Sequence, residues 1–431
     1  MIYVAIIAVL AFVLVTGALL GPAIGAIGLA VLLFEFNGNF NVFANAIWNI
    51  FSSSTLIAVP VFMLLGEMLG QTGIAKRIYA ALTPAFEHMP GKLLQVNVAT
   101  CTVFSALNGS SMATTAAVGS IAFHELDGLG YDRRAVVGSI VGGGSLGMLI
   151  PPSVIMIIYA SLVEVSVGNL FVAGILPGLM IAAIFMSYIA VTTILRPTIV
   201  PPGRGRASFA QAVVASLQAW PFIVLIMAIL GTILLGWATP TEAAALGVAT
   251  TLILGFLYRE LTLKKIWAAL RSTAIGFGSI MLILIASITL FQAVALAGLP
   301  EVLLSVVAEA DLPPWAILVI LYLMYLGLGA ILDGFGMMLI TLPIVFPLVT
   351  GLGYDPVWFG IVVVLLIETS VLTPPVGFNL FVIVAVSRGK VTLGEAARAA
   401  IPYWLLLMFS LTLLTLEPRI ATFLPQLAFP V

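Results

Sequence analysis

Charged residues are scarce in this chain. Of its 431 residues only 8% are Asp, Glu, Lys or Arg, while 62% are hydrophobic. An ordinary soluble domain has about 25% charged and roughly 45 to 50% apolar residues. A large soluble core does not account for the difference, because apolar runs of about 20 residues, the length that crosses a bilayer, recur along the whole sequence. The composition therefore predicts an all-α integral membrane protein with several spans.

Cysteine, histidine and net charge are also low, and each excludes a class of function. Cys101 is the only cysteine, and His88 and His124 are the only histidines. A single cysteine cannot form an intramolecular disulfide, and three dispersed residues do not make a clustered metal site. The formal net charge of −1 makes nucleic acid an unsuitable partner. Residues 1–20 lack a basic start and a small-residue cleavage site, so we expect a retained span rather than a signal peptide.

What the chain does contain is a long repeat. The pentapeptide GLGYD occurs at 128–132 and again at 351–355, a shift of 223 residues (351 − 128), and a Pro-Pro pair follows each copy at the same distance. The same shift aligns apolar segments of the two halves. We therefore expect two copies of one unit, residues 1–194 and 218–431, joined by a polar linker at 195–217.

Hydropathy and the placement of Pro and Gly predict the same elements in both copies. Two pairs of apolar segments are each too short to span, since a crossing takes about 20 helical residues, and we interpret them as re-entrant hairpins at 92–126 and 313–349. Two longer segments, 133–166 and 357–387, contain Pro-Pro pairs and glycines and should be broken helices. The TPTE sequence at 239–242 predicts a helix start with a capping box. The ten predicted crossings are 2–20, 22–36, 54–71, 133–166, 168–193, 218–236, 240–258, 273–296, 357–387 and 400–417.

The basic residues predict the orientation of the two copies. With these crossings the clusters of Lys and Arg all fall on one side, which the positive-inside rule assigns to the cytoplasm. The first GLGYD precedes Arg133 and Arg134 on that side, whereas the second precedes Pro356 on the other. The copies are therefore expected to be inverted, with both termini outside, as is typical of secondary transporters. Two amphipathic segments, 73–87 and 261–272, are expected to lie along the membrane surface.

The first candidate site combines the hairpin tip at 104–115 with the helix break at 142–153. Carbonyls at a break lack helical partners and suit a small cation such as sodium, while the free N–H groups of half-helix N-termini suit a carboxylate. The alternative is that the many Gly and Ser residues here only permit close helix packing. The hydroxyl side chains that we expect to contact a substrate are Ser110, Ser111, Thr114 and Ser153.

The second candidate site combines the tip at 326–338 with the break at 368–379. Asp333 lies deep in an apolar run, where an ionised group costs roughly 2.5 to 3.5 kcal/mol on insertion scales, so a functional or paired role is expected. Asn379 is polar within an apolar half-helix and is a candidate substrate contact. Glu368 is open to a functional or a structural interpretation.

Two other functions are compatible with parts of the sequence. A stand-alone carrier or sodium/proton antiporter would use Asp333, Glu368 and Glu67 to relay protons, although a structural partner explains Glu67 equally well. An intramembrane aspartyl protease would use the aspartates of the two GLGYD copies, but the predicted topology puts Asp132 and Asp355 on opposite faces, about 30 Å apart. No His-Glu-x-x-His or Walker sequence is present. We therefore expect a transporter and not an enzyme.

Several motifs together resemble one transporter family. They are FSALNGSS at 104–111, GYDRR at 130–134, GGSLGMLIPPS at 143–153, FVAGILPG at 171–178, TPTEAAALG at 239–247, ITLPIVFP at 340–347 and LTPPVGFNLFV at 372–382. The combination extends over nearly the whole chain and is similar to the large membrane subunit of tripartite ATP-independent periplasmic (TRAP) transporters. The resemblance implies a sodium-driven carrier of organic acids, such as C4-dicarboxylates or sialic acid. In such a carrier a transport domain holding both hairpins moves like an elevator against a scaffold.

The resemblance also implies ligands and partners. It implies at least two sodium sites and no organic cofactor, with one site formed largely by backbone carbonyls of the first tip and break. The implied partners are a separate small four-helix membrane subunit and a periplasmic substrate-binding protein, in the bacterial inner membrane. Asn108 stands where the family often has Ser, which keeps a carbonyl contact but loses a hydroxyl contact. Carried onto this sequence, the sodium-site residues are Ser105, Asn108, Gly147, Ile150 and Pro152 for the first site and Gly329, Ser370, Thr373 and Gly377 for the second.

Overall fold

The computed structural model describes residues 40–202, 220–298 and 312–429, together with residues 25, 26, 28–30, 302, 304, 305 and 309. Every regular element within these residues is helical. The predicted span 2–20, most of 22–36, most of the linker 195–217 and the start of the span at 218–236 lie outside the described residues.

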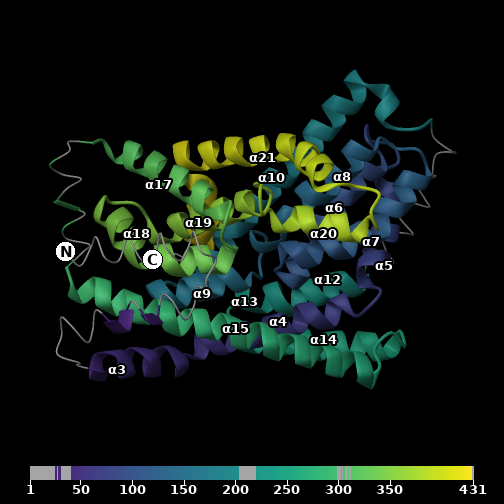
Figure 1. Ribbon diagram of the computed structural model, residues 1–431. Coiled ribbons are helices and arrows are strands. Elements are labelled where there is room, and N and C mark those ends of the chain that lie inside the picture. Colours follow the sequence, from purple (N-terminus) through teal and green to yellow (C-terminus); the bar gives the residue numbers. More distant parts are fainter. Residues whose placement is uncertain are drawn as a thin grey trace.

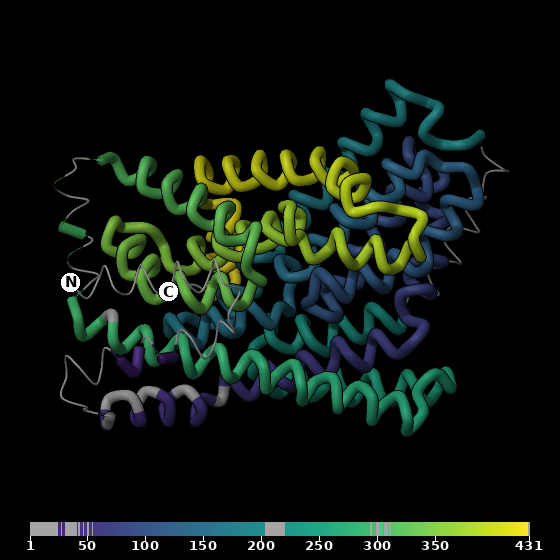
Figure 2. The backbone as a smooth tube through the Cα atoms, viewed as in Figure 1, coloured from purple at the N-terminus to yellow at the C-terminus, as the bar shows by residue number. Residues whose placement is uncertain are grey.

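Five described helices are long and apolar enough to cross a membrane. A sixth candidate is the pair α4 (Ser54–Gly70) and α5 (Ile74–Phe86), which is bent by 67°. The five are α10 (Val167–Leu195), α14 (Pro240–Leu257), α15 (Leu263–Leu296), α18 (Gly334–Gly351) and α21 (Leu393–Leu416). Long helices run from left to right in Figure 1, with α14 and α15 on the lower side and α21 on the upper side, and Figure 2 traces the same path. This is the architecture of a multi-pass membrane protein.

Two antiparallel helices occupy the first predicted hairpin, α6 (Leu93–Asn108) and α7 (Ser111–Gly128). Gly109 joins them in the left-handed conformation, with φ of 62°, and the Ser110 side chain caps α7 by accepting a hydrogen bond from Ala113 N. Glycine adopts this conformation without a Cβ clash, so the tight turn follows from the local sequence. Entry and exit of this hairpin on one membrane face stays a prediction.

The first broken helix consists of α8 (Arg133–Gly144), a 3-10 turn η1 (Ser145–Met148) and α9 (Val154–Val163). The α-helix continues through the three consecutive glycines and ends at Gly144. The break occupies residues 145–153. The two prolines of this stretch have no N–H to donate, so regular helical bonding cannot continue across it. The break thus begins directly after the glycines and contains the Pro-Pro pair.

The second half of the chain contains helices in the same order. They are α17 (Pro314–Gly329) and α18, followed by α19 (Pro356–Ser370) and α20 (Phe378–Val386). The break between α19 and α20 contains the second Pro-Pro pair, and Gly377 with φ of 38° begins α20.

Helix caps in the two halves fall at positions related by the 223-residue shift. Asp333 caps α18 where Ser110 caps α7. Asp355 caps α19 where Asp132 caps α8. A short oxygen-bearing side chain at each position accepts the free N–H groups of the first helical turn, so the same local rule begins each pair of helices. The inverted orientation of the halves stays a prediction.

The prediction of a separate surface helix at 261–272 is wrong. The segment 261–272 and the span 273–296 form a single helix, α15, which is capped by Thr262. The amphipathic start of this helix carries several basic residues, which lower the local hydropathy. However, no proline or glycine interrupts it before Gly276, so the helical hydrogen bonding continues into the apolar part.

The start of the last long span is also corrected. Helix α21 begins at Leu393 and not near residue 400, because Thr392 and Glu395 form a capping box. The capping box predicted at 239–242 is present at the start of α14. Helix starts are thus set by polar caps, whereas hydropathy marks only the apolar part of each helix.

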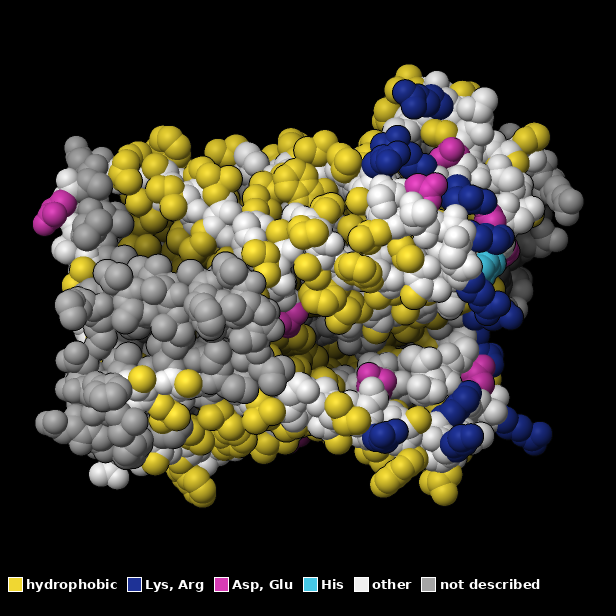
Figure 3. All heavy atoms as spheres, viewed as in Figure 1, with side chains coloured by type: hydrophobic (Ala, Val, Ile, Leu, Met, Phe, Trp, Pro, Cys, Tyr) yellow, Lys and Arg dark blue, Asp and Glu magenta, His cyan; other side chains and the backbone are white. Residues whose placement is uncertain are grey.

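Basic side chains gather at one end of the molecule. Figure 3 shows Lys and Arg at its right end, with mainly hydrophobic and uncharged side chains over the middle. At this end Asp127 of α7 forms ion pairs with Arg133 (2.9 Å) and Lys390 (2.8 Å). A second pair, Arg77 with Glu260, joins α5 to the loop before α15. The charge distribution has the asymmetry that the positive-inside rule requires, and the cytoplasmic location of this end stays a prediction.

Candidate functional site

The turn between α6 and α7 packs directly against the first helix break. A Cβ placed on Gly147 would overlap the backbone of Ser110 and Ser111, and a Cβ on Gly109 would lie 2.5 Å from the carbonyl oxygen of Pro152. Only glycine permits two backbones to approach this closely. We call this contact, between residues 105–115 and 144–153, the junction. It brings together the tip and the break that the sequence pairs in the first candidate site.

A carboxylate from the second half reaches into the junction. The Glu368 side chain, on α19, is 1% exposed. Its Oε2 accepts a hydrogen bond from Ser111 Oγ at 2.6 Å, and its Oε1 accepts one from Met148 N at 2.5 Å. Glu368 therefore joins the hairpin tip to the 3-10 turn of the break, and neither donor carries a charge. A buried carboxylate with only neutral donors is costly unless it is protonated or lies close to a cation.

Three buried hydroxyl groups of the junction have no hydrogen-bond partner among the described residues. They belong to Ser105, Thr115 and Ser153, and each residue is 0% exposed. Thr115 lies against Gly144, and Ser153 lies against Gly109. Buried polar atoms are nearly always satisfied in native proteins, so these oxygens are candidate ligands for an ion or a water molecule. Hydroxyl and carbonyl oxygens are suitable ligands for a small hard cation.

Other predicted residues of the first site stabilise the turn. Asn108 Oδ1 accepts from Ser110 N at 2.7 Å, and its Nδ2 donates to Thr114 Oγ1 at 3.1 Å. The carbonyl oxygen of Asn108 faces α4, where a Cβ on Gly66 would lie 3.0 Å away. The side chains of Asn108, Ser110 and Thr114 are thus engaged within the tip. The contribution that these residues could make to a ligand site is through their backbone oxygens. Ile150 and Pro152 lie buried in the break itself.

The second hairpin tip packs against the end of α19. A Cβ on Gly329 would overlap Ser370, and one on Gly334 would overlap the side chain of Ile367. Ser370 Oγ donates to the Ile367 carbonyl at 2.7 Å. The structure therefore brings together Gly329 and Ser370, two residues of the predicted second sodium site, and sodium binding there stays a prediction.

The side chain of Thr373 is held by α21. Its Oγ1 donates to the Thr369 carbonyl at 2.9 Å and accepts from Trp404 Nε1 at 2.9 Å. Gly377 lies at the other end of the same break, at the start of α20. Trp404 carried no signal in the sequence, because tryptophan in an apolar helix is typical of any membrane protein.

Asp333 and Asn379 differ in what their side chains do. Asp333 Oδ2 accepts from Phe335 N and Gly336 N at 3.1 and 3.3 Å, so it caps its own helix. The hydrogen bonds of this cap offset part of the cost of placing an aspartate in an apolar run. Asn379 is fully buried, and both atoms of its side-chain amide lack partners among the described residues. Because its side chain is not engaged, Asn379 is the better candidate of the two for a substrate contact.

Sequence reasoning left the role of Glu368 open, and its partners could not be found from the sequence. The available signal was an ionisable residue inside an apolar run. Its contacts with Ser111 and Met148 lie 257 and 220 residues away in the chain. Glu67, the other acid considered for a proton relay, is half-buried on α4.

The aspartates required by a protease serve as helix caps in different halves of the molecule. Asp132 Oδ1 accepts from Ala135 N at 2.8 Å, and Asp355 Oδ1 accepts from Trp358 N at 2.8 Å. Helices α7 and α8 lie at the right end of Figure 1, whereas α18 and α19 lie in its left half. These two side chains have structural roles and are not brought together.

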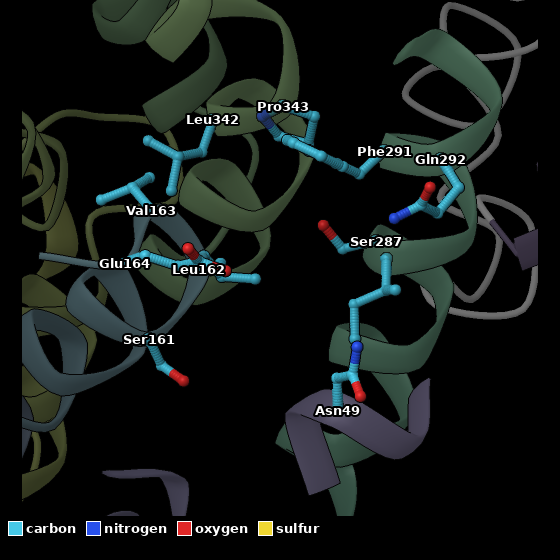
Figure 4. A pocket seen from close by; sticks show the side chains of 11 residues that line it. Asn49, Ser161, Leu162, Val163, Glu164, Ser287, Phe291, Gln292, Leu342 and Pro343 are labelled. Atoms are coloured by element: carbon cyan, nitrogen blue, oxygen red, sulfur yellow. The ribbon is translucent and has the colours of Figure 1, made fainter. Parts of the chain in front are cut away.

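A separate cavity of about 170 Å³ lies in the half of the molecule away from the basic end. Figure 4 shows residues of α3 (Phe40–Phe51) and α15 on one side of it and residues of α9 and α18 on the other. No junction residue lines this cavity. Its lining side chains belong to Asn49, Ser161, Leu162, Val163, Glu164, Ser287, Ile288, Phe291, Gln292, Leu342 and Pro343.

Comparison with solved structures supports a transporter fold. A transporter of Alcanivorax borkumensis, YdaH, superposes with a TM-score of 0.67 over 91% of each chain at 14% identity. The efflux pump MtrF of Neisseria gonorrhoeae superposes with a TM-score of 0.60 over 91% of this chain and 85% of its own, also at 14% identity. At such low identity the likeness concerns the fold alone.

Comparison of sequences identifies the family. A C4-dicarboxylate TRAP transporter large permease protein of Pseudomonas aeruginosa is 36% identical over 375 residues, covering 86% of both chains. A sialic acid TRAP transporter large permease protein of Vibrio cholerae is 29% identical and covers 96% of both, and an ectoine TRAP transporter large permease protein of Halomonas elongata is 30% identical and covers 87% of both. Residues 7–420 match the model of the DctM component of tripartite ATP-independent periplasmic transporters. The chain therefore belongs to the large permease subunits of TRAP transporters, as its motifs predict.

Proposed function

We propose that this chain carries a carboxylate substrate inward together with sodium, by an elevator movement of the part that holds both hairpins. The observation that carries the proposal is the junction. There a buried carboxylate, Glu368, and three unpartnered hydroxyl oxygens lie around a helix break whose peptide groups have left regular helical bonding. A cation at this place would satisfy the oxygens and offset the cost of the buried charge.

The sodium ligands proposed for the first site are backbone and hydroxyl oxygens of the junction. Ser105 and Ser153 supply unpartnered hydroxyls, and the break from Gly147 to Pro152 supplies carbonyls. The second site is proposed where Gly329 meets Ser370, close to Thr373 and Gly377. Each sodium moving down 100 mV supplies about 2.3 kcal/mol. Two ions would therefore support roughly a 2500-fold concentration of a neutral substrate, and the charge of a carboxylate would reduce this.

The substrate is proposed to be an organic acid. The relatives named above carry C4-dicarboxylate, sialic acid or ectoine in their names, and all three kinds of compound contain a carboxylate group. Half-helix N-termini at the junction offer free N–H groups to an anion. Ser111 already donates to Glu368, so the unpartnered amide of Asn379 is the side chain proposed to add specificity.

The proposed partners are a small four-helix membrane subunit and a periplasmic binding protein, in the inner membrane, with the basic end of this chain in the cytoplasm. The cavity of about 170 Å³ has α3 and α15 on one side and α9 and α18 on the other. Under this proposal it separates the scaffold from the moving part. It would lie on the periplasmic side.

Reconstitution tests the proposal directly. Liposomes that contain this chain and its small subunit, supplied with the binding protein outside, should accumulate a carboxylate only when an inward sodium gradient is present. Liposomes without the chain provide the baseline. Equal uptake with potassium replacing sodium would contradict sodium coupling, and uptake driven instead by a proton gradient would favour the antiporter alternative.

A further inference from the structure

A second cavity of about 310 Å³ lies at the basic end of the molecule, between the start of α8 and the start of α21. Arg133, Arg134 and Val137 line it from α8, and Val391, Glu395 and Arg398 line it from the segment that leads into α21 and from α21 itself. None of these residues belongs to the junction. In Figure 3 the Lys and Arg side chains gather at this end.

The charges around this cavity leave two arginines available. Asp127 forms ion pairs with both Arg133 and Lys390. Hydrogen bonds from Lys390 and from Arg133 lower the pKa of the Asp127 carboxyl, so Asp127 stays ionised at neutral pH and keeps these two cations occupied. Arg134 and Arg398 form no ion pair within the described part of the chain.

The glutamate that lines the cavity with these arginines caps a helix. Glu395 Oε2 accepts from the backbone N and the Oγ1 of Thr392, at 2.8 and 2.9 Å, as the cap of α21. Arg134 Nη2 donates to the carbonyl of Arg398 at 3.1 Å, which places the two guanidinium-bearing residues side by side across the cavity. The three arginines and one glutamate that line the cavity give its lining a net charge of +2. Planar guanidinium groups match the oxygens of a phosphate in two-point hydrogen bonds.

An apolar stripe continues from this cavity along α21. Ile401, Leu405 and Phe409 are 49%, 55% and 53% exposed. They follow Arg398 at intervals of three or four residues, so the four side chains lie on one face of the helix. In a membrane protein an exposed stripe of this kind contacts lipid chains. A ligand with a phosphate group and hydrocarbon chains can therefore use both parts, whereas a free phosphate can use only the arginines.

We propose that the cavity between α8 and α21 binds the phosphodiester headgroup of an anionic phospholipid, with an acyl chain along Ile401 and Leu405. The headgroup phosphate lies between Arg134 and Arg398. Tyr403 of α21 already packs against Gly138 and Gly142 of α8, and a lipid bound to both helices would strengthen this contact. Helix α8 leads to the junction. This role does not depend on which substrate is carried.

The test uses the purified full-length chain in detergent and follows its thermal unfolding with added lipid. Phosphatidylglycerol should raise the midpoint more than phosphatidylcholine does. The double variant R134Q/R398Q should bind phosphatidylglycerol about tenfold more weakly, the factor expected from losing charge-assisted hydrogen bonds. The variant K264Q/R271Q removes the same charge from exposed positions of α15 and should behave as the wild type.

The same titration separates the possible sources of the phosphate. Inorganic phosphate and soluble glycerophosphoglycerol should not replace the lipid at equal concentration, and equal protection by either would overturn the lipid assignment. Equal weakening in R134Q/R398Q and K264Q/R271Q would show a general effect of surface charge and reject the site. If the double variant does not fold, the single variant R398Q, which breaks no ion pair, decides the question in the same way.

Discussion

One carboxylate links the two halves of the chain at the junction. Glu368 lies on α19, and both of its hydrogen-bond donors lie in the first half of the chain. Because the donors are neutral, its ionised form depends on a cation being close, which couples its charge to ion binding. The same side chain therefore has a packing role, through the hydrogen bonds, and under the proposed function an electrostatic role.

Two substitutions separate these roles. Glu368→Gln keeps one acceptor for Met148 N and leaves Ser111 a partner, but it removes the charge. We expect E368Q to unfold at the wild-type midpoint. Its sodium-dependent uptake should fall by about tenfold or more, and a tenfold change corresponds to about 1.4 kcal/mol. Glu368→Ala leaves a buried N–H unpaired and should lower the free energy of unfolding by about 1 to 3 kcal/mol. Thermal unfolding and liposome uptake measure the two effects.

The matched control is Glu417→Gln, which changes an exposed glutamate at the end of α21. It should alter neither the midpoint nor uptake. Wild-type sodium dependence in E368Q would show that the charge of Glu368 has no part in ion coupling.

At the scale of elements, the junction depends on glycine. The 3-10 turn η1 approaches the tip between α6 and α7 so closely that no side chain fits at residue 147. The predicted helix break supplies irregular backbone, and the predicted hairpin supplies a tight turn. Their contact requires both irregular backbones to meet with nothing between them.

The variant Gly147→Ala tests this contact. Its Cβ would overlap the backbone at Ser110 and Ser111, which cannot rotate away, so we expect a loss of about 1 to 3 kcal/mol in the free energy of unfolding. Uptake should fall with it, because the tip is displaced from the break. Thermal unfolding of the purified variant measures the first effect.

Gly394→Ala provides the comparison. This glycine lies in the first turn of α21 with open space at its Cβ position. Alanine there should be neutral or should stabilise the protein by up to about 1 kcal/mol, since it favours the helix. A G147A variant as stable as G394A would mean that the tip and the break do not pack as closely as described.

At the scale of the whole molecule, the two ends differ in charge. Basic side chains gather at one end, whereas the cavity lined by Ser161 and Glu164 lies in the other half. The positive-inside rule predicts that the basic end is cytoplasmic, which would place the cavity on the periplasmic side. This orientation predicts which residues a membrane-impermeant reagent can reach from each side of the membrane.

Cysteine labelling in intact cells tests the orientation. In a Cys101→Ala background, Glu164→Cys should react with a membrane-impermeant thiol reagent added outside. Glu395→Cys, at the basic end, should react only after the membrane is permeabilised. Both glutamates are exposed, so a difference in labelling reports sidedness and not burial. Labelling of residue 395 in intact cells would reverse the proposed orientation.

Local rules in the sequence predicted much of the fold correctly. The capping box at 239–242, the turn after Asn108 and the break at the first Pro-Pro pair all occur where the sequence places them. The errors arose where hydropathy was used to find helix ends. Helix α15 passes through a basic stretch without interruption, and α21 begins seven residues before the predicted span, at Leu393.

The sequence by itself determined the membrane class, the order of helices and turns, and the family, because composition, Pro and Gly positions and helix caps act through neighbouring residues. Only the tertiary structure decided which side chains share the site. It showed that Glu368 bonds to a serine 257 residues away and that Asp333 caps a helix. It also showed that the side chains of Ser105, Ser153 and Asn379 have no partner among the described residues. These outcomes depend on how separate helices pack against one another, and no local pattern in the chain specifies that contact.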